Sequence, residues 1–201
     1  MEILNLYAGI GGNRKLWKDV NVTAVEINTD IAKIYQEFFQ DDKVIVGDAH
    51  EFLLENFKDY DFIWSSPPCP THSITRFMHD KKVYPDMNLY QEIILLQQWG
   101  KNKWVVENVV PYYEHLIKPI AIVHRHSFWS NFGIATKNYP GFKTCKMRGE
   151  REFLQKEFGF NIDRYDVENK RQILRNCVYP DLGKFVFDCA FKLQQEKLIE
   201  G

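Results

Sequence analysis

The chain has few of the features that mark secreted, membrane-spanning or zinc-binding proteins. Among 201 residues there are four cysteines and no Cys-x-x-Cys pair, so neither a disulfide scaffold nor a metal site is indicated, and reduced thiols are expected. No stretch approaches the roughly 20 apolar residues that span a bilayer, and the N-terminus lacks a basic leader followed by an apolar core. We therefore expect a soluble, intracellular protein. Its length suits one core with at most one small appended lobe.

Acidic residues are missing from one long stretch of the second half. Residues 1–100 carry 9 basic and 15 acidic side chains and residues 101–201 carry 17 and 12, although the net charge of the chain is only −1. Positions 115–149 hold no acid, and six basic side chains are interleaved there with aromatic ones: Lys118, Arg125, Lys137, Lys143, Lys146 and Arg148. Such a stretch suits a phosphate backbone, and the alternative interpretation is a solvated basic face.

Short apolar runs alternate with segments of helical periodicity over the first half of the chain. Strands are predicted at 3–6, 22–26, 44–48, 62–64 and 103–107, and helices at 31–39, 51–54 and 89–99, with a further helix beginning at 13–17. A final helical segment is predicted over 171–198. This alternation predicts an α/β fold with a doubly wound, mostly parallel sheet covered on both faces.

Polar residues and glycines follow the predicted strands at the ends where such sheets bind ligands. A glycine loop, Tyr7-Ala8-Gly9-Ile10-Gly11-Gly12, follows the first strand, and Glu26 and Asp48 end the second and third. Glycines let a backbone approach a ligand closely, and the two acids can accept hydrogen bonds from ribose hydroxyls and an adenine amino group. The spacing is not Gly-x-Gly-x-x-Gly, which favours an adenosine ligand without phosphate. A tight turn and helix caps are the alternative interpretations.

A cysteine and a glutamate end the next two strands. Cys69 follows Pro67 and Pro68, whose fixed φ angles stiffen the turn that aims the thiol. Glu107 ends the following strand, which places a carboxyl group near this thiol at the same sheet edge. Taken singly, Cys69 would be a small buried hydrophobe and Glu107 a strand-end cap. Together they suggest a nucleophile with an acid beside it.

These segments resemble, in order, the motifs of the cytosine-5 DNA methyltransferases, and the chain looks like a compact member of phage or bacterial type. Tyr7 stands where phenylalanine is usual in the cofactor loop. The similar segments span nearly the whole chain: Tyr7 to Gly12, Val25-Glu26-Ile27-Asn28, Gly47-Asp48-Ala49, Pro67-Pro68-Cys69 with Ser73, Glu107-Asn108-Val109, and Arg171-Gln172 with Asn176-Cys177-Val178.

The resemblance implies a Rossmann-like, class I methyltransferase that uses S-adenosyl-L-methionine and double-stranded DNA, in the cytoplasm of a bacterial or phage-infected cell. It gives cofactor contacts to Tyr7, Ala8, Gly9, Ile10, Gly11, Gly12, Glu26, Ile27, Asp48, Ala49, Pro68 and Asn176, and catalytic roles to Cys69, Glu107, Asn108 and Arg125. The thiolate would add to C6 of a flipped-out cytosine while Glu107 engages N3, so that C5 attacks the methyl group. A cationic surrounding would lower the pKa of the thiol.

Two segments depart from the family pattern. His124-Arg125-His126-Ser127-Phe128 stands where the family usually has Gln-x-Arg-x-Arg before a strand, and two expected arginines appear as histidines. Arg125 would supply the missing cation, although strand alternation predicts that it points away from both histidines. Arg175 replaces the glycine that normally precedes Asn176. A polar loop over 70–85 resembles the mobile loop that closes over DNA in the family.

The target-recognition region is short for this family. We assign residues 1–132 and 171–201 to the catalytic domain and 133–170, rich in glycine, basic and aromatic residues, to a small target-recognition lobe. So short a region implies a short or degenerate recognition sequence, or help from a second copy of the chain or a helper subunit.

Three other functions compete with DNA methylation. A tRNA cytosine-5 methyltransferase would carry the same catalytic motifs, and the acid-free basic stretch suits either polymer. A non-catalytic nucleic-acid-binding module is disfavoured because it needs none of Cys69, Glu107, Glu26 and Asp48. An unrelated nucleotide-binding enzyme is disfavoured by the glycine spacing.

Overall fold

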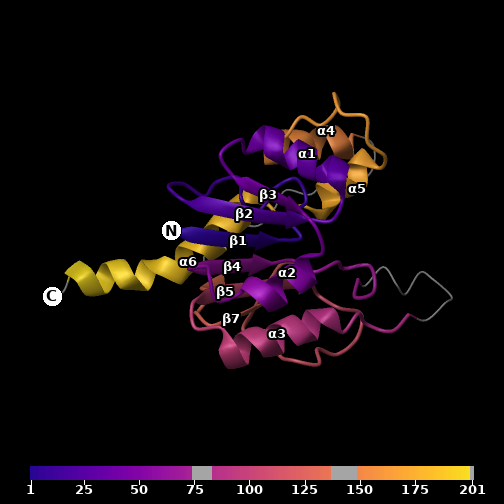
Figure 1. Cartoon of the computed structure of the whole chain (residues 1–201). Helices are drawn as coiled ribbons and strands as arrows, with labels where there is room; N and C mark the ends of the chain where they lie inside the picture. Colours follow the sequence, from indigo (N-terminus) through magenta and orange to yellow (C-terminus); the bar gives the residue numbers. More distant parts are fainter. Residues whose placement is uncertain (74–82, 137–148, 200–201) are drawn as a thin grey trace.

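The central feature is a seven-stranded sheet, formed within residues 1–73, 83–136 and 149–199, which the computed structural model describes (Figure 1). The strand order is β3-β2-β1-β4-β5-β7-β6. Five strands are parallel: β1 (Glu2–Leu6), β2 (Asn21–Glu26), β3 (Lys43–Val46), β4 (Phe62–Ser65) and β5 (Lys103–Val109). β7 (His126–Ser130) pairs antiparallel with β5, and β6 (Ala121–Val123) pairs antiparallel with β7. The predicted doubly wound, mostly parallel α/β sheet is confirmed.

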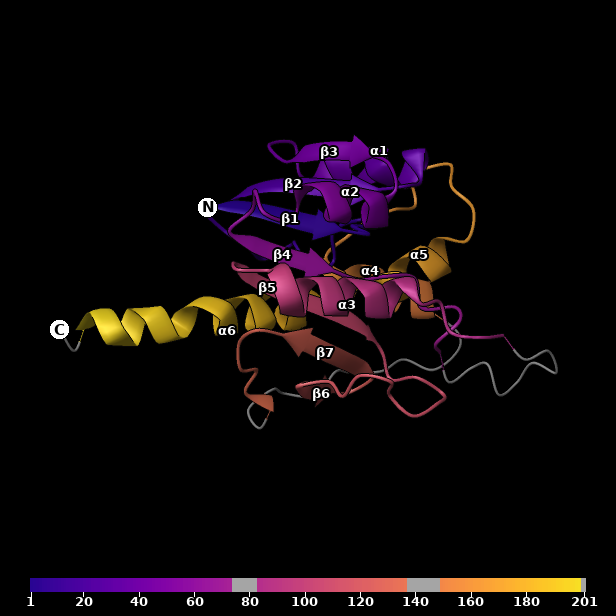
Figure 2. The ribbon, with the colours of Figure 1, turned by 60° about the horizontal axis from the view of Figure 1, so that its bottom comes forward.

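Helices cover both faces of the sheet (Figures 1 and 2). α2 (Ala49–Asn56) and α3 (Asn88–Trp99) pack on one face, and α1 (Thr29–Phe38) and α6 (Pro180–Ile199) on the other. Successive strand residues therefore enter different layers: Ile3 packs on the α6 side and Leu4 on the α2 and α3 side. This is why the strands are nearly continuous apolar runs rather than alternating ones.

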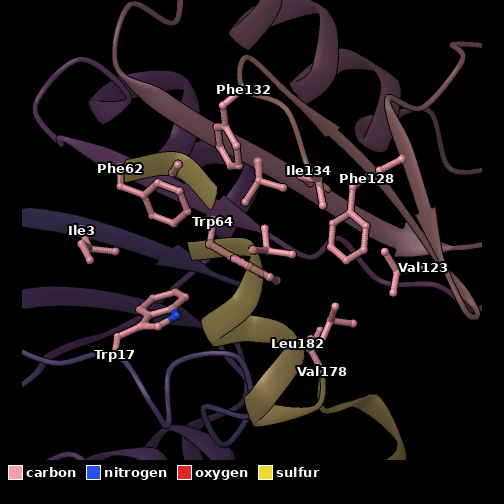
Figure 3. Packing of buried hydrophobic residues seen from close by; sticks show 14 of the residues in the cluster. Ile3, Trp17, Phe62, Trp64, Val123, Phe128, Phe132, Ile134, Val178 and Leu182 are labelled. Atoms are coloured by element: carbon pink, nitrogen blue, oxygen red, sulfur yellow. The ribbon is translucent and has the colours of Figure 1, made fainter. Parts of the chain in front are cut away.

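Aromatic side chains fill the layer between the sheet and α6 (Figure 3). Phe62 and Trp64 of β4 meet Trp17 from the loop after β1, and Trp17 stacks on Phe187 of α6 with ring centroids 5.1 Å apart. Leu182 of α6 is fully buried beside them. Because aromatic side chains bury large areas, this cluster fixes α6 against the centre of the sheet.

The helix predicted to begin at 13–17 is not formed. The segment makes turns instead, in which the Trp17 N–H donates to the Arg14 carbonyl at 3.0 Å. Arg14 is held by a bidentate pair with Asp42, and the Trp17 ring is buried among residues of β4 and α6. The prediction was wrong because α6, from the far end of the chain, covers the sheet face that a crossover helix would otherwise cover.

The second half of the chain holds further differences from the predicted pattern. The single predicted segment 171–198 is two helices, α5 (Lys170–Asn176) and α6, because Pro180 restricts the residue before it and starts a new helix. α4 (Glu150–Phe158) was not predicted. It packs with α5 beside α1 through Leu154 and Phe158. No helix among the described residues is long and apolar enough to cross a membrane.

Candidate active site

The carboxyl ends of the five parallel strands bring the predicted functional segments to one edge of the sheet. The glycine loop follows β1, Glu26 ends β2, Asp48 lies two residues after β3, Cys69 follows β4, and Glu107 lies near the end of β5. β1 stands between β2 and β4 in the sheet. The glycine loop therefore lies between the strand ends that carry Glu26 and Asp48 and the segment Pro67-Pro68-Cys69, which is called the nucleophile segment because it carries the predicted nucleophile. The edge therefore has two halves. The cofactor half, with the glycine loop, Glu26 and Asp48, is suited to a nucleoside, and the nucleophile half, with Cys69 and Glu107, is suited to covalent chemistry.

Glu26 holds the glycine loop in place. Its Oε2 accepts from the Gly9 N–H at 2.9 Å, and its Oε1 accepts from the Asn28 N–H at 2.9 Å. Gly9 has φ +54, and a Cβ added there would meet nothing within 4 Å, so the space above this backbone is open. The loop thus presents main chain, with a fixed carboxylate at its side, to whatever binds above Gly9.

The other two glycines have a packing role. A Cβ on Gly11 would lie 2.2 Å from the Phe39 ring, and one on Gly12 would lie 2.5 Å from the Val178 carbonyl oxygen. Gly12 therefore lies directly against the segment between α5 and α6. Through this contact the predicted final motif, with Asn176 at the end of α5, returns to the glycine loop.

Asp48 and Ile27 complete the cofactor half of the edge. Asp48 is the N-cap of α2, and its Oδ1 accepts from the backbone N–H groups of His50 and Glu51. Both cap bonds go to Oδ1, so Oδ2 is the oxygen suited to an amino group. Ile27 is 68% exposed, which places a large apolar side chain beside Glu26. Open main chain, two placed carboxylates and an exposed apolar side chain fit an adenosine group.

The nucleophile segment is fixed at both ends. The Asn108 side-chain amide donates to the Pro67 carbonyl at 2.9 Å, which ties β5 to the segment. The Cys69 carbonyl accepts from the His72 and Ser73 N–H groups, which closes a tight turn. Cys69 itself is half-buried, while the neighbouring Pro68 is exposed. The thiol is therefore held on a short turn whose direction Asn108 sets.

The pKa of Cys69 is raised above its ordinary value. Burial is the largest cause and the charge of Glu107 adds to it, while Arg125 acts in the opposite direction. The expected cationic surrounding is thus present in Arg125, but in the free protein it does not outweigh burial. The protonated thiol is therefore the resting form of Cys69 at neutral pH.

Glu107 is buried and is contacted through both carboxylate oxygens. The Ser66 hydroxyl donates to Oε2 at 2.8 Å and in turn accepts from the Trp64 indole N–H at 2.8 Å. The Nδ1 atom of His126 lies 2.6 Å from Oε1. These contacts fix the plane of the carboxyl group at the strand edge next to the nucleophile segment.

His126 is a site residue that the sequence analysis did not assign. His124 and Arg125 form the turn between β6 and β7, with His124 at φ +54, so the alternation expected of a strand does not apply and Arg125 does not point away from His126. Arg125 Nε donates to His126 Nε2 at 3.4 Å, and Arg125 Nη2 donates to the Arg175 carbonyl at 2.9 Å. Arginine only donates, so His126 Nε2 accepts and Nδ1 carries the hydrogen directed at Glu107.

A second unassigned residue, Glu92 of α3, lies below the edge with no exposed surface. It accepts from Tyr7 and Ser65 and pairs with His50. One signal could have found it: Glu92 is spaced three residues from Leu89 and four from Leu96, which are buried on the same helical face. An acid on an apolar helical face is expected to be buried, and a buried acid needs hydrogen-bonding partners to offset the cost of leaving water.

Parts of the predicted site lie outside the described residues. These are the loop residues Arg76, His79, Lys81 and Lys82 and the basic residues Lys137, Lys143, Lys146 and Arg148. Of the predicted recognition region, residues 133–136 and 149–170 are described. Within 149–170, Leu154, Phe158, Phe160 and Ile162 pack against Ile10 of the glycine loop and Ile34 of α1.

The mostly parallel sheet, with its glycine loop and acids at the carboxyl edge, defines a Rossmann-like methyltransferase fold. A structure of the Entamoeba histolytica methyltransferase EhMeth is similar over 96% of this chain and 98% of that chain, with a TM-score of 0.55 and 13% identity, which supports the fold. The chain belongs to the C-5 cytosine-specific DNA methylase family, whose model matches residues 1–115.

Other similar structures match a smaller part of the chain. DNMT2 of Spodoptera frugiperda, solved as a mutant, is 30% identical over 54% of this chain, with a TM-score of 0.41, and the match covers 35% of that longer chain. A prophage-encoded putative DNA modification methyltransferase of Escherichia coli is 20% identical over 57% of this chain and 34% of that chain, with a TM-score of 0.38. No curated protein sequence matches the chain.

Proposed function

We propose that this protein transfers a methyl group from S-adenosyl-L-methionine to C5 of a cytosine flipped out of double-stranded DNA. The observation that carries the proposal is the hydrogen bond from Asn108 of β5 to Pro67 in the segment after β4. It holds the half-buried Cys69 where the charge of Glu107 acts on it. A thiol and a carboxyl group at one sheet edge, beside a loop that fits an adenosine group, are what this reaction requires.

The residues of the chain carry the steps on either side of the transfer. The Cys69 thiolate forms a bond to C6 of the cytosine while Glu107 donates a proton to N3, so that electrons of the ring become available at C5. S-adenosyl-L-methionine supplies the electrophilic methyl group when bound. Solvent water then removes the hydrogen on C5 as a proton, N3 returns its proton to Glu107, and the Cys69 sulfur leaves as the C5–C6 double bond re-forms.

Arg125 is proposed as the cation near the reacting thiol. It opposes the effect of burial on the pKa of Cys69 and also contacts His126 and the Arg175 carbonyl. The guanidinium therefore acts on Cys69 through its charge, contacts the histidine that contacts Glu107, and binds a carbonyl of α5. Within the cofactor half, we assign the ribose to Glu26 and the adenine to Asp48 and Ile27. The remaining contacts are assigned to Tyr7, Ala8, Gly9, Ile10, Gly11, Gly12, Ala49, Pro68 and Asn176.

The region 133–170 is proposed to recognise the target sequence, with a second copy or a helper subunit completing it. Its residues 149–170 pack on α1 and the glycine loop through Phe158 and Phe160 rather than standing apart. A recognition segment packed in this way would move together with the catalytic domain. Short recognition sequences are expected for so small a region.

The substrate is tested by methyl transfer to two polymers in parallel. Labelled S-adenosyl-L-methionine is incubated with unmethylated duplex DNA and, separately, with bulk tRNA, and label in each polymer is counted. We expect label in DNA, followed by its identification as 5-methylcytosine. Label confined to tRNA would instead make the protein an RNA methyltransferase, and label in neither polymer would contradict an enzymatic function for the isolated chain.

The ribose assignment predicts a large loss of cofactor affinity in Glu26→Ala. An uncharged replacement removes hydrogen bonds to a carboxylate, each worth about 1.5–3 kcal/mol, so binding is expected to weaken by on the order of 10-fold to 100-fold. S-adenosylhomocysteine binding is measured by calorimetry. Glu51→Ala is the matched control, because Glu51 is an exposed acid at the start of α2. Equal affinity in the two variants would remove Glu26 from the cofactor site.

A further inference from the structure

Glu92 is a buried carboxylate that the proposed reaction does not use. It lies on α3 with 0% exposure, and its two oxygens have three partners. The Tyr7 hydroxyl donates to Oε1 at 2.6 Å, the Ser65 hydroxyl donates to Oε2 at 2.5 Å, and His50 Nδ1 lies 3.0 Å from Oε1. Burying an acid costs free energy unless such partners satisfy its hydrogen bonds, so the three partners explain why an acid lies at this buried position.

The three partners come from three different functional segments. Tyr7 opens the glycine loop after β1, His50 lies two residues after Asp48, and Ser65 ends β4 just before the nucleophile segment. β1 and β4 are neighbours in the sheet, with Leu6 opposite Ser65. Glu92 therefore lies beneath the junction of the cofactor half and the nucleophile half of the edge.

Tyr7 has a conformation that needs such support. Its φ is +55, in the left-handed region that side chains other than glycine rarely adopt. A residue of this kind persists where its surroundings fix it, and the bond from the Tyr7 hydroxyl to Glu92 supplies that constraint. The direction in which the glycine loop leaves β1 thus depends on a side chain of α3.

The buried Glu92 acts on the protonation of His50. Hydrogen bonding to Glu92 raises the pKa of His50, although burial lowers it, and the Glu92 and Asp48 charges also raise it. The groups that face the imidazole are Glu92 and Gln91 from α3 and Asp48 from the start of its own helix. These neighbours therefore favour the protonated form of His50.

We propose that Glu92 is a positioning residue that anchors the cofactor loop and the nucleophile segment to one point, so that its loss impairs both halves of the site together. The inference rests on the proposed function of this edge. Tyr7 is the contact to the cofactor half and Ser65 the contact to the nucleophile half. A substitution of Tyr7 or Ser65 is therefore one-sided, since it should affect one half of the edge, whereas a substitution of Glu92 should affect both halves.

The test measures the two halves without methyl transfer. Cofactor binding is followed by calorimetry with S-adenosylhomocysteine, and the nucleophile segment by the rate at which iodoacetamide alkylates the peptide containing Cys69, read by mass spectrometry. Glu92→Gln keeps the size of the side chain but cannot accept hydrogen bonds through both ends of the group. We expect about tenfold weaker binding and several-fold faster alkylation of the half-buried thiol.

One-sided variants separate anchoring from general loosening. Tyr7→Phe should weaken binding more than it changes alkylation, and Ser65→Ala should speed alkylation more than it changes binding. Glu55→Gln, an exposed acid on α2, is the matched control and should change neither. Thermal unfolding of each variant shows whether it is folded.

The pH profile gives a further readout. A raised His50 pKa means that the charged pair stabilises the fold below the ordinary histidine pKa and that this contribution is lost as pH rises through the raised pKa. Glu92→Gln should reduce that part of the pH dependence of unfolding. Wild-type protein that binds no S-adenosylhomocysteine would overturn the proposed function and this inference with it. Binding by wild type, with Glu92→Gln unchanged in both assays, would overturn the inference alone.

Discussion

Cys69→Ser is expected to lower methyl transfer to DNA by on the order of 10³-fold or more, because removal of a covalent nucleophile removes the step that activates C5. A serine hydroxyl occupies nearly the same space as the thiol but ionises far less readily at neutral pH. Label incorporated into unmethylated duplex DNA is the measurement. Cys189→Ser is the control, because Cys189 is a half-buried thiol on α6, on the sheet face covered by that helix.

A trapping experiment separates covalent catalysis from loss of folding. DNA carrying 5-fluorocytosine cannot complete the last step, because fluorine does not leave C5 as a cation, and the Cys69 adduct therefore persists. Wild-type protein should form a denaturation-resistant complex with this DNA, and Cys69→Ser should form none while still binding S-adenosylhomocysteine. Methyl transfer retained by the serine variant would show that the chemistry does not pass through Cys69.

His126→Ala is expected to lower turnover by about 100-fold, with cofactor affinity nearly unchanged. An acid positioned at a reacting group contributes roughly 10²–10⁴-fold, and Glu107 loses one of the two contacts that fix its carboxyl plane when the imidazole is removed. The hydrogen bonds of His126 to Glu107 and Arg125 lie in the half of the edge that holds Cys69. The effect should therefore fall on kcat rather than on S-adenosylhomocysteine binding.

The hydrogen-bond geometry at His126 indicates a second substitution that should restore part of the activity. The amide nitrogen of asparagine lies close to the place of imidazole Nδ1, so His126→Asn keeps a donor toward Glu107 Oε1 and should recover part of the lost turnover. His115→Ala is the matched control, because His115 contacts Ser127 of the same strand and has no contact with Glu107 among the hydrogen bonds described. Equal turnover in the alanine and asparagine variants would argue against the donor role.

The positions of the first five strands, and the sheet edge where the functional residues meet, could be predicted because they depend on local sequence pattern. Each of the first five strands is an apolar run, and the acids and the thiol follow these runs directly, so parallel pairing brings them to one edge. The loop before Trp17 could not be predicted correctly, since its conformation depends on α6, which is remote in sequence. Competition of this kind between local propensity and distant packing is decided only in the folded chain.

The buried contacts at the site required knowledge of register. His126 reaches Glu107 because β7 pairs antiparallel with β5, with Val109 opposite His126, and no local pattern fixes that alignment. Glu92 could be recognised as an acid on an apolar helical face, but its partners Tyr7 and Ser65 become neighbours only when α3 docks on β1 and β4. Sequence patterns therefore indicated the reacting groups better than the residues that hold them.

The packing of α6 on the loop after β1 has a consequence for the order in which the protein becomes competent during synthesis. A Cβ on Gly183 would lie 2.3 Å from the Asn13 carbonyl oxygen, and the Trp17 indole donates to the Gly183 carbonyl across 166 positions of sequence. A nascent chain that has extended only through β7 has its glycine loop and Cys69 but lacks the helix that holds that loop from below. Because domains generally acquire native packing as whole units, cofactor binding should begin only after Gly183 has left the ribosome.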